Sequence, residues 1–321
     1  MKRVFLFAAA VITIATAACV QFQAPLPGND AFPNLPPIVA WRLASGSATF
    51  DEILAVNPDG SNLTTVAKLP TDKVKRQASV SWLQDHRSFV IWRVQSSNSV
   101  NGIVSLFNGT QERRCLGRRF VGEPVIFESQ PMLSETNNIV YTTPLLADLQ
   151  GYGRLNLQTC RYEITRTYIP QGDFYATTYC IPKKWWGFED LYAGSIIYDQ
   201  SITAMAHLSI TAALSWSPDC SKLVGAKSNG WYLFETGKWD SPVQILSKDL
   251  SAHFLLMRDS ANVVISRPSW SPDQRYFVYS THLIRGGVDD LYGRATSYIV
   301  DTTSGTEQVL LDDAAYPDWR K

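Results

Sequence analysis

A short motif that recurs along the chain constrains its fold more than any other feature. Trp-Ser-Pro-Asp stands at Trp216 and again at Trp270, and an apolar run follows each copy within a few residues. Trp82 belongs to a degenerate copy, Met132 marks a weaker one, and Ala315–Trp319 at the C-terminus looks like the first half of another. The similar intervals indicate an array of one supersecondary unit, whose copies bury their apolar faces against one another.

Each copy reads as a small antiparallel sheet. In the Ser-Pro-Asp turn the proline ring fixes φ, and the Asp side chain accepts backbone N–H groups. The apolar run then predicts a central strand, and two more strands follow in most copies. These later strands are expected at residues 103–107 and 112–116 after Trp82, 231–235 and 243–246 after Trp216, and 297–301 and 307–311 after Trp270. The motif carboxylates are therefore interpreted as turn caps and the motif indoles as packing anchors; they are Asp85, Asp219, Asp273, Asp318, Trp82, Trp216, Trp270 and Trp319.

The first unit lacks its first strand. Residues 38–42, 52–57 and 63–69 read as second, third and fourth strands, and the missing first strand is found at residues 316–319. We expect this C-terminal strand to join the N-terminal three and close a ring, because closure removes free strand edges. The long interval between the markers at 132 and 216 either contains one more unit or carries an insertion, so five or six units are expected, with six preferred.

These features together resemble the repeats of TolB-type, WD40-like β-propellers, and similar repeats occur in the propellers of prolyl oligopeptidase-like enzymes. The resemblance rests on Trp-Ser-Pro-Asp, the apolar strand after it, and turns such as Asn-Pro-Asp-Gly-Ser-Asn at residues 57–62. It implies an all-β fold, a single β-propeller of five or six four-stranded blades over residues 38–321. The glycine that usually follows the motif Asp is replaced by Cys220 and Gln274, so the repeats are degenerate. The sequence shows no counterpart of the α/β domain that precedes the propeller in the TolB family, and a repeat motif describes a scaffold rather than a function.

The N-terminus reads as an export signal. Lys2 and Arg3 precede an apolar run over residues 4–18, which is shorter than a membrane span and ends in small residues. Thr16-Ala17-Ala18-Cys19 resembles a bacterial lipobox, which implies lipidation of Cys19 after removal of residues 1–18; plain secretion is the alternative. Residues 19–37 then read as a Pro-rich tether. We expect an exported protein held by its lipid on the outer face of the cell membrane or on the outer membrane.

Charge and cysteine usage exclude several functions. The formal net charge is zero, so no basic surface for nucleic acid is expected. The histidines are scattered and no nucleophile motif is present, so we expect no metal, no cofactor and no assignable catalytic residue. Beyond Cys19 the chain has Cys115, Cys160, Cys180 and Cys220, which allow three pairings; a disulfide between Cys160 and Cys180 is favoured.

The stretch from 168 to 198 is the least repeat-like and holds the candidate binding residues, which are Lys184, Trp185, Trp186, Phe188 and Tyr192. Adjacent tryptophans cannot both face one side of a strand, so at least one is expected to be exposed or to lie in a loop. Exposed aromatics beside lysine suit a protein or glycan partner, and packing into the domain's own core is the alternative. The leading hypothesis is a non-enzymatic scaffold that binds a protein or glycan at the cell envelope. The alternatives are a carbohydrate-active hydrolase with carboxylates in the central funnel, and a purely structural component.

Overall fold

The structure is a computed structural model, and it places the described residues in one compact unit. It describes residues 37–42, 50–70, 78–82, 89–94, 102–107, 112–116, 132–133, 138–146, 149–156, 159, 161–169, 174–190, 194–199, 201, 203–209, 212–251, 263–283 and 295–320. The chain divides into two units, 1–30 and 31–321, and every described residue belongs to the second. The predicted signal peptide and Cys19 therefore lie outside the described residues.

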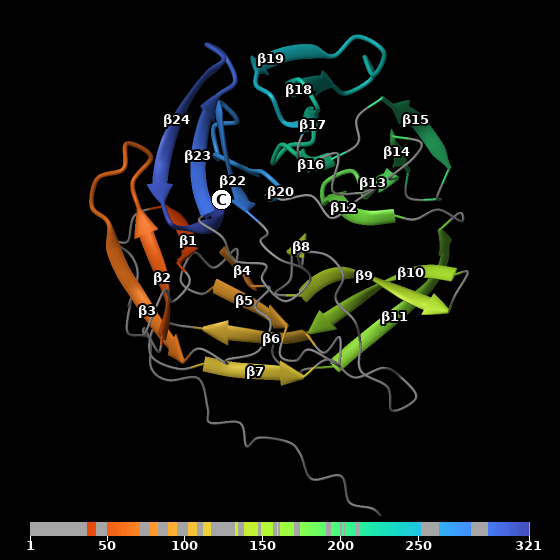
Figure 1. Cartoon of the computed structure of the whole chain (residues 1–321). Helices are drawn as coiled ribbons and strands as arrows, with labels where there is room; N and C mark the ends of the chain where they lie inside the picture. Colours follow the sequence, from red (N-terminus) through yellow and green to blue (C-terminus); the bar gives the residue numbers. More distant parts are fainter. Residues whose placement is uncertain are drawn as a thin grey trace, which may run out of the picture. The chain divides into compact units, whose positions relative to one another are not determined.

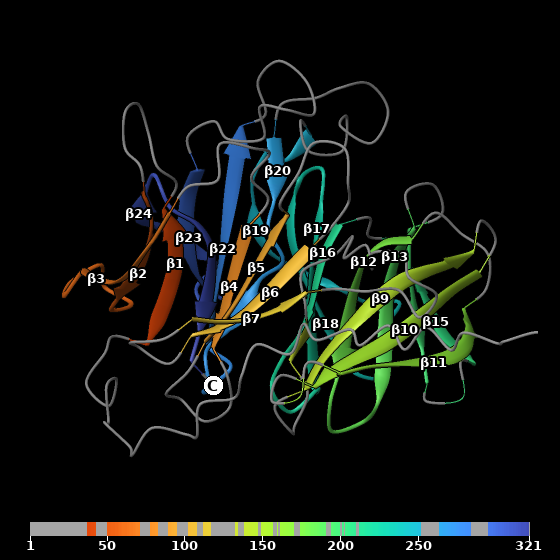
Figure 2. The ribbon, with the colours of Figure 1, turned by 90° about the horizontal axis from the view of Figure 1, so that it is seen from below.

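The described residues are almost entirely strands, which form six antiparallel sheets (Figure 1). The first sheet has the order β25 (Ala315–Trp319), β1 (Ile38–Arg42), β2 (Phe50–Val56), β3 (Thr64–Pro70). The second contains β4 (Ala78–Trp82), β5 (Phe89–Val94), β6 (Gly102–Phe107) and β7 (Glu112–Leu116). The third contains β8 (Met132–Leu133), β9 (Asn138–Leu146), β10 (Leu149–Asn156) and β11 (Arg161–Ile169). Figure 2 shows β9, β10 and β11 side by side.

The remaining three sheets continue the same meander. The fourth contains β12 (Phe174–Cys180), β13 (Trp185–Asp190), β14 (Gly194–Tyr198) and β15 (Ala204–Leu208). The fifth contains β16 (Ala212–Trp216), β17 (Lys222–Lys227), β18 (Gly230–Glu235) and β19 (Val243–Ser247). In the sixth, β20 (Val263–Ile265) and β21 (Ser269–Trp270) both pair with β22 (Tyr276–Leu283), which is followed by β23 (Ala295–Asp301) and β24 (Thr306–Asp312). The strands expected from the sequence after each motif are confirmed to within two residues.

The C-terminal strand completes the N-terminal sheet, as predicted. In the pairing of β25 with β1, Ile38 stands opposite Trp319 and Val39 opposite Asp318. Beyond the strand, the Arg320 N–H donates to the Pro37 carbonyl at 2.8 Å. The long interval between the markers at 132 and 216 contains two complete sheets, the third and the fourth, so the described strands form six sheets rather than five.

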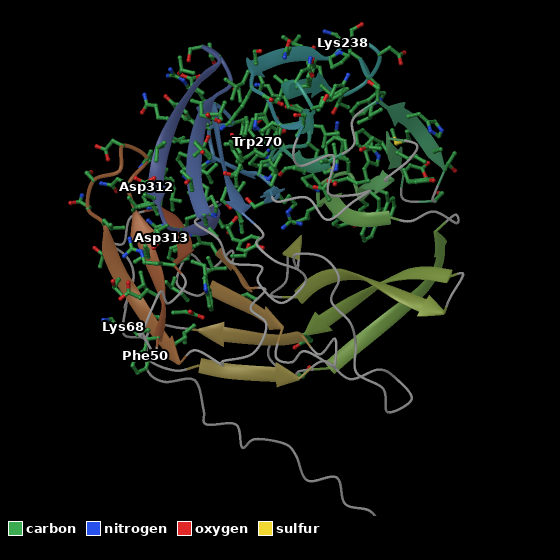
Figure 3. All side chains as sticks on the ribbon, in the orientation of Figure 1. Phe50, Lys68, Lys238, Trp270, Asp312 and Asp313 are labelled. Carbon is green, nitrogen blue, oxygen red and sulfur yellow. A yellow bond between two sulfur atoms is a disulfide. The ribbon has the colours of Figure 1, made fainter. Side chains whose placement is uncertain are left out.

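Apolar clusters hold neighbouring sheets together. The four motif indoles are all buried, which confirms their interpretation as packing anchors, and Trp270 lies inside the unit in Figure 3. Its Nε1–H donates to the Ser215 carbonyl of the fifth sheet at 3.1 Å. The clusters join the fourth sheet to the fifth (Ile197, Leu223), the fifth to the sixth (Trp231, Phe277), the sixth to the first (Val278, Val56) and the first to the second (Trp41, Trp82). Each fully buried large apolar side chain stabilises the fold by roughly 1.5–3 kcal/mol.

The Ser-Pro-Asp turns explain why glycine is usual after the motif Asp. Cys220 and Gln274 both have a φ of 59°, in the left-handed region that side chains other than glycine adopt at a cost. The Asp219 carboxylate accepts the Ser221 N–H at 2.8 Å, and Asp273 accepts the Arg275 N–H at 3.2 Å. Both carboxylates are therefore turn caps, as predicted; Asp85 lies outside the described residues.

Candidate functional site

One disulfide links the fourth sheet to the fifth, and it is not the predicted one. Cys180, the last residue of β12, is bonded to Cys220, with their Cα atoms 5.8 Å apart. The expected pairing of Cys160 with Cys180 is therefore wrong, and Cys160 itself lies outside the described residues. Cys220 occupies the left-handed position of a Ser-Pro-Asp turn, which lies against the neighbouring sheet. Proximity along the chain favoured Cys160, but the partner is set by contact between sheets.

Two of the candidate binding residues are part of the core. Trp186 and Phe188 lie on one face of β13, and their rings stack 5.9 Å apart. Both are buried, and Tyr198 packs edge-on against Phe188. Burial leaves neither side chain free to contact a partner, so the expectation that they do is corrected. Tyr192 lies outside the described residues.

Lys184 and Trp185 remain accessible beside a tight turn. The turn at residues 181–184, hereafter the lysine turn, joins β12 to β13, and Lys183 and Lys184 are both exposed. Lys184 has a φ of 55° and its N–H donates to the Ile181 carbonyl at 3.3 Å. The Lys183 N–H donates to the Sγ of Cys180 at 3.3 Å, so the disulfide also supports the turn.

Three tryptophans form a row next to the lysine turn. Trp185 begins β13 rather than lying in a loop, and it is half-buried. Its ring centroid is 5.9 Å from that of Trp216, and Trp216 is in turn 5.8 Å from Trp239. The Lys183 ammonium stands 4.5 Å from the Trp185 ring centroid. Sequence reasoning missed Trp239, which lies in the turn between β18 and β19; its position next to the charged Lys238 was the available signal.

A second polar feature joins the inner strands, and it corrects the role of Asp318. Trp319 ends β25 as Trp270 ends β21, so Asp318 corresponds to Ser269 and not to a turn carboxylate. One oxygen of Asp318 accepts the Trp82 N–H at 2.7 Å, and the other accepts the Ser269 hydroxyl at 2.6 Å. Asp318 is therefore a bridge among the sixth, first and second sheets, and its interpretation as a turn cap is wrong.

Glu189 makes the corresponding bridge between the fourth and fifth sheets. It is buried on β13, and its carboxylate accepts the Leu214 N–H at 2.7 Å. That N–H is presented by a bulge in β16, where Ala213 has a φ of 54°. Burial raises the pKa of Glu189 to about 7, and the N–H groups of Leu214 and Ala213 and the charge of Arg267 oppose this rise.

Arg267 interacts electrostatically with both of these carboxylates. It belongs to the break between β20 and β21 in the sixth sheet. Burial lowers the pKa of its guanidinium, while the negative charges of Asp318 and then Glu189 favour the charged form. Ionisable groups from three sheets thus influence one another electrostatically: Glu189 of the fourth, Arg267 of the sixth and Asp318 of the first. The sequence offered one hint, a glutamate directly after the apolar run from Trp185 to Phe188.

Two kinds of feature are absent from the part of the chain that the structure describes. No three or more His, Cys, Asp or Glu side chains there are arranged to hold a metal ion. Among the same residues, no helix has the length and apolar character needed to cross a membrane.

Comparisons with known proteins show the fold. No protein-family model matches the sequence, and no curated protein matches it. Among solved structures, TolB from Acinetobacter baumannii is similar with a TM-score of 0.60 and 16% identity, over 88% of this chain and 66% of that one. A TolB protein from Agrobacterium tumefaciens, described as putative, gives a TM-score of 0.56 and 10% identity, over 86% of this chain and 89% of that one. The periplasmic gluconolactonase PpgL from Pseudomonas aeruginosa gives 0.47 and 11%, over 87% of this chain and 82% of that one.

These values establish architecture and leave activity open. The chain spans just under two thirds of the length of the Acinetobacter protein. The fold similarity to two TolB structures, together with the six antiparallel sheets of this chain, makes it a TolB-like β-propeller.

Proposed function

We propose that this chain is a lipid-anchored, extracytoplasmic scaffold that binds a protein or a glycan at the cell envelope and catalyses no reaction. One observation carries the non-enzymatic part. Among the described residues, the carboxylates of Glu189 on β13 and Asp318 on β25 accept backbone N–H groups of the next sheet. Carboxylates used in this way hold sheets together.

The alternative, a hydrolase with carboxylates in the funnel, draws no support from the described residues. Glycoside hydrolysis requires one carboxylic acid and one carboxylate that face a sugar bond from opposite sides. Both oxygens of Asp318 already accept hydrogen bonds, from Trp82 and Ser269. Glu189 has the raised pKa typical of a general acid, but it is buried, and Leu214 donates to its carboxylate. Neither group is placed to meet a substrate.

The anchor and the location rest on the sequence. Cys19 follows an apolar run that ends in small residues, and a Pro-rich segment separates it from the propeller. A lipid with two or more acyl chains on one cysteine holds a protein firmly on a membrane, since each buried CH₂ contributes about 0.8 kcal/mol.

The binding residues proposed here are the accessible ones near the lysine turn. Lys184 and Trp185 come from the original candidates, and Lys183 and Trp239 join them in space. An exposed cation beside a half-buried indole is a common arrangement at interfaces that bind a partner.

Lipidation can be tested directly on the full chain expressed in a bacterial host. We expect the mature protein to begin at Cys19, to carry diacylglyceryl by mass spectrometry, and to remain with the membrane fraction. Cys19→Ser should prevent the modification and release the protein. An unmodified, soluble parent protein would remove the anchor from the proposal.

Binding can be tested by crosslinking the full chain to envelope extract. The parent should capture a partner that a Lys184→Gln/Trp185→Ala variant does not. Lys68→Gln/Phe50→Ala, which changes an exposed lysine and an exposed aromatic in the first sheet, serves as the matched control and should capture normally. Equal capture by both variants would place the binding site elsewhere, and no capture by any form would remove the scaffold proposal.

A further inference from the structure

We infer that the lysine turn and its tryptophan row bind an anionic glycan at the surface of the membrane that carries the anchor. This inference rests on the proposed binding function and names the chemical class of its ligand. It combines three features: where the chain enters the propeller, which lysines are unpaired, and what surrounds them.

The turns that follow the inner strands lie next to one another from sheet to sheet. The disulfide joins Cys180, directly before the lysine turn, to Cys220 in the turn of the fifth sheet, and the Ser221 hydroxyl donates to Gln274 of the sixth at 3.4 Å. The ring of Tyr276 stacks on Trp319 of the first sheet with centroids 6.3 Å apart. Arg320 stands 5.4 Å from the ring of Trp82 of the second sheet. These contacts place the turns on one continuous rim.

The chain enters the propeller on this same rim. Arg320 donates its N–H to the Pro37 carbonyl, and β1 begins at the next residue. Residues 20–36 separate Cys19 from this point, and a chain of that length spans at most roughly 60 Å. The anchored end therefore joins the rim that presents the lysine turn, and a ligand on the anchoring membrane lies within reach of it.

The lysine turn offers positive charge that the described part of the chain does not neutralise. Lys68 pairs with Glu52, Lys238 with Glu235, and Lys248 with Glu307, whereas Lys222 and Lys227 form no ion pair with a described residue but are not adjacent to another lysine. Lys183 and Lys184 are exposed, and neither forms an ion pair with a described residue. Two adjacent unpaired ammonium groups select an anionic ligand, with a phosphate or a carboxylate as the paired group.

The tryptophan row gives this charge a surface that suits sugar rings. Trp185 and Trp239 are half-buried on either side of Trp216, which holds both indoles in place. The C–H groups of a pyranose pack on aromatic surface, and the Lys183 ammonium lies 4.5 Å from the Trp185 ring. An anionic group paired with Lys183 would thus bring its own sugar ring against indole.

A protein partner fits this patch less well. Protein interfaces place apolar anchors at their centre. The large apolar side chains that stand exposed in the described residues are Phe50, Leu63, Met205, Val243 and Val309, and none belongs to the lysine turn or to β13. The patch is polar and aromatic, which favours the glycan.

The test is titration calorimetry of the purified full-chain protein in detergent. The probes are an oligogalacturonate, a phosphomannan fragment, a neutral maltooligosaccharide, and poly-glutamate of matched charge. We expect binding to at least one anionic glycan, with affinity that falls as salt rises, and no binding to the neutral sugar or to poly-glutamate. Lys183→Gln/Lys184→Gln and, separately, Trp239→Ala should each weaken binding roughly tenfold.

The controls separate this inference from the proposed function. Lys68→Gln and Phe50→Ala should bind as the parent does, and thermal unfolding of every variant shows that it is folded. Equal binding of poly-glutamate would overturn the glycan class, because charge alone would then suffice. Capture of an envelope protein through the same residues, without glycan binding, would overturn this inference and leave the scaffold proposal standing. If the parent protein neither bound an anionic glycan nor captured an envelope protein, this inference and the scaffold proposal would both be wrong.

Discussion

At the scale of single residues, this propeller uses the buried Glu189 and the half-buried Asp318 to connect neighbouring sheets. Glu189 and Asp318 each accept a backbone N–H from the inner strand of the following sheet. A buried carboxylate without partners would cost several kcal/mol, so these hydrogen bonds and the nearby Arg267 are what allow the groups to be there. For Glu189 these partners do not fully offset the cost of burying the charge, so its pKa is raised to about 7.

This raised pKa predicts how stability depends on pH. Between pH 4.5 and 7 the unfolded chain ionises Glu189 while the folded chain keeps its proton, so stability falls as the pH rises through that window. The loss attributable to this residue approaches about 3 kcal/mol above pH 7. Glu189→Gln should remove that part of the slope in urea unfolding measured from pH 4.5 to 8.

The matched control is Glu235→Gln, an exposed carboxyl whose pKa is lowered by Lys238. It titrates below the window, so it should leave the slope above pH 5 unchanged. A Glu189→Gln protein that retains the slope of the parent would show that another group titrates there.

At the scale of elements, the bridge between β12 and the turn after β16 fastens two sheets. The disulfide between Cys180 and Cys220 closes a loop with a sequence separation of 40. In the chain-entropy model such a loop contributes about 4 kcal/mol, because it restricts the unfolded chain.

Removing the disulfide should therefore lower the free energy of unfolding by up to about 4 kcal/mol. Cys180→Ala, Cys220→Ala and the double variant should lose nearly the same amount, since each removes the one bond. Chemical unfolding with and without reductant measures this, and reductant should bring the parent close to the variants. Additive losses in the double variant would contradict a shared bond.

The strands, turns and disulfide also show which features of the fold could be predicted from the sequence. Strands such as β1 and β7 and the turn caps at Asp219 and Asp273 were predictable, because alternation and turn chemistry are local. The partner of Cys180 was not predictable, because it is set by contact between sheets. Asp318 was misread because Pro317-Asp318 imitates the motif turn, although the strand places Trp319 at the motif position.

The candidate site in the fourth sheet was likewise predictable only in part from the sequence. Two adjacent tryptophans did predict opposite faces of a strand, and Trp185 and Trp186 occupy them. Which one would be buried depended on Phe188 and Tyr198, whose packing no spacing reveals. Trp239 came to the site from another sheet, through Trp216.

At the scale of the whole molecule, the first sheet depends on both ends of the chain. β25 pairs with β1, and it also supplies Trp319 to the apolar cluster between the sixth and first sheets. Deleting residues 314–321 would leave β1 with an unpaired edge and remove the Asp318 bridge.

We expect that deletion to abolish the single cooperative unfolding transition and to cause association through the open edge. Unfolding followed by tryptophan fluorescence, together with size-exclusion chromatography, measures both effects. Deletion of Lys321 alone is the control and should behave as the parent. A monomeric, cooperatively unfolding truncated chain would mean that β25 is dispensable.

The pairing of β25 with β1 also sets the order of events in the life of the chain. β25 follows every other described strand along the chain, so it is synthesised after them, and the first sheet is completed only once it arrives. A nascent chain that still lacks β25 has β1 without its partner strand. In the export route proposed above, the first sheet would therefore close only after β25 had crossed the membrane.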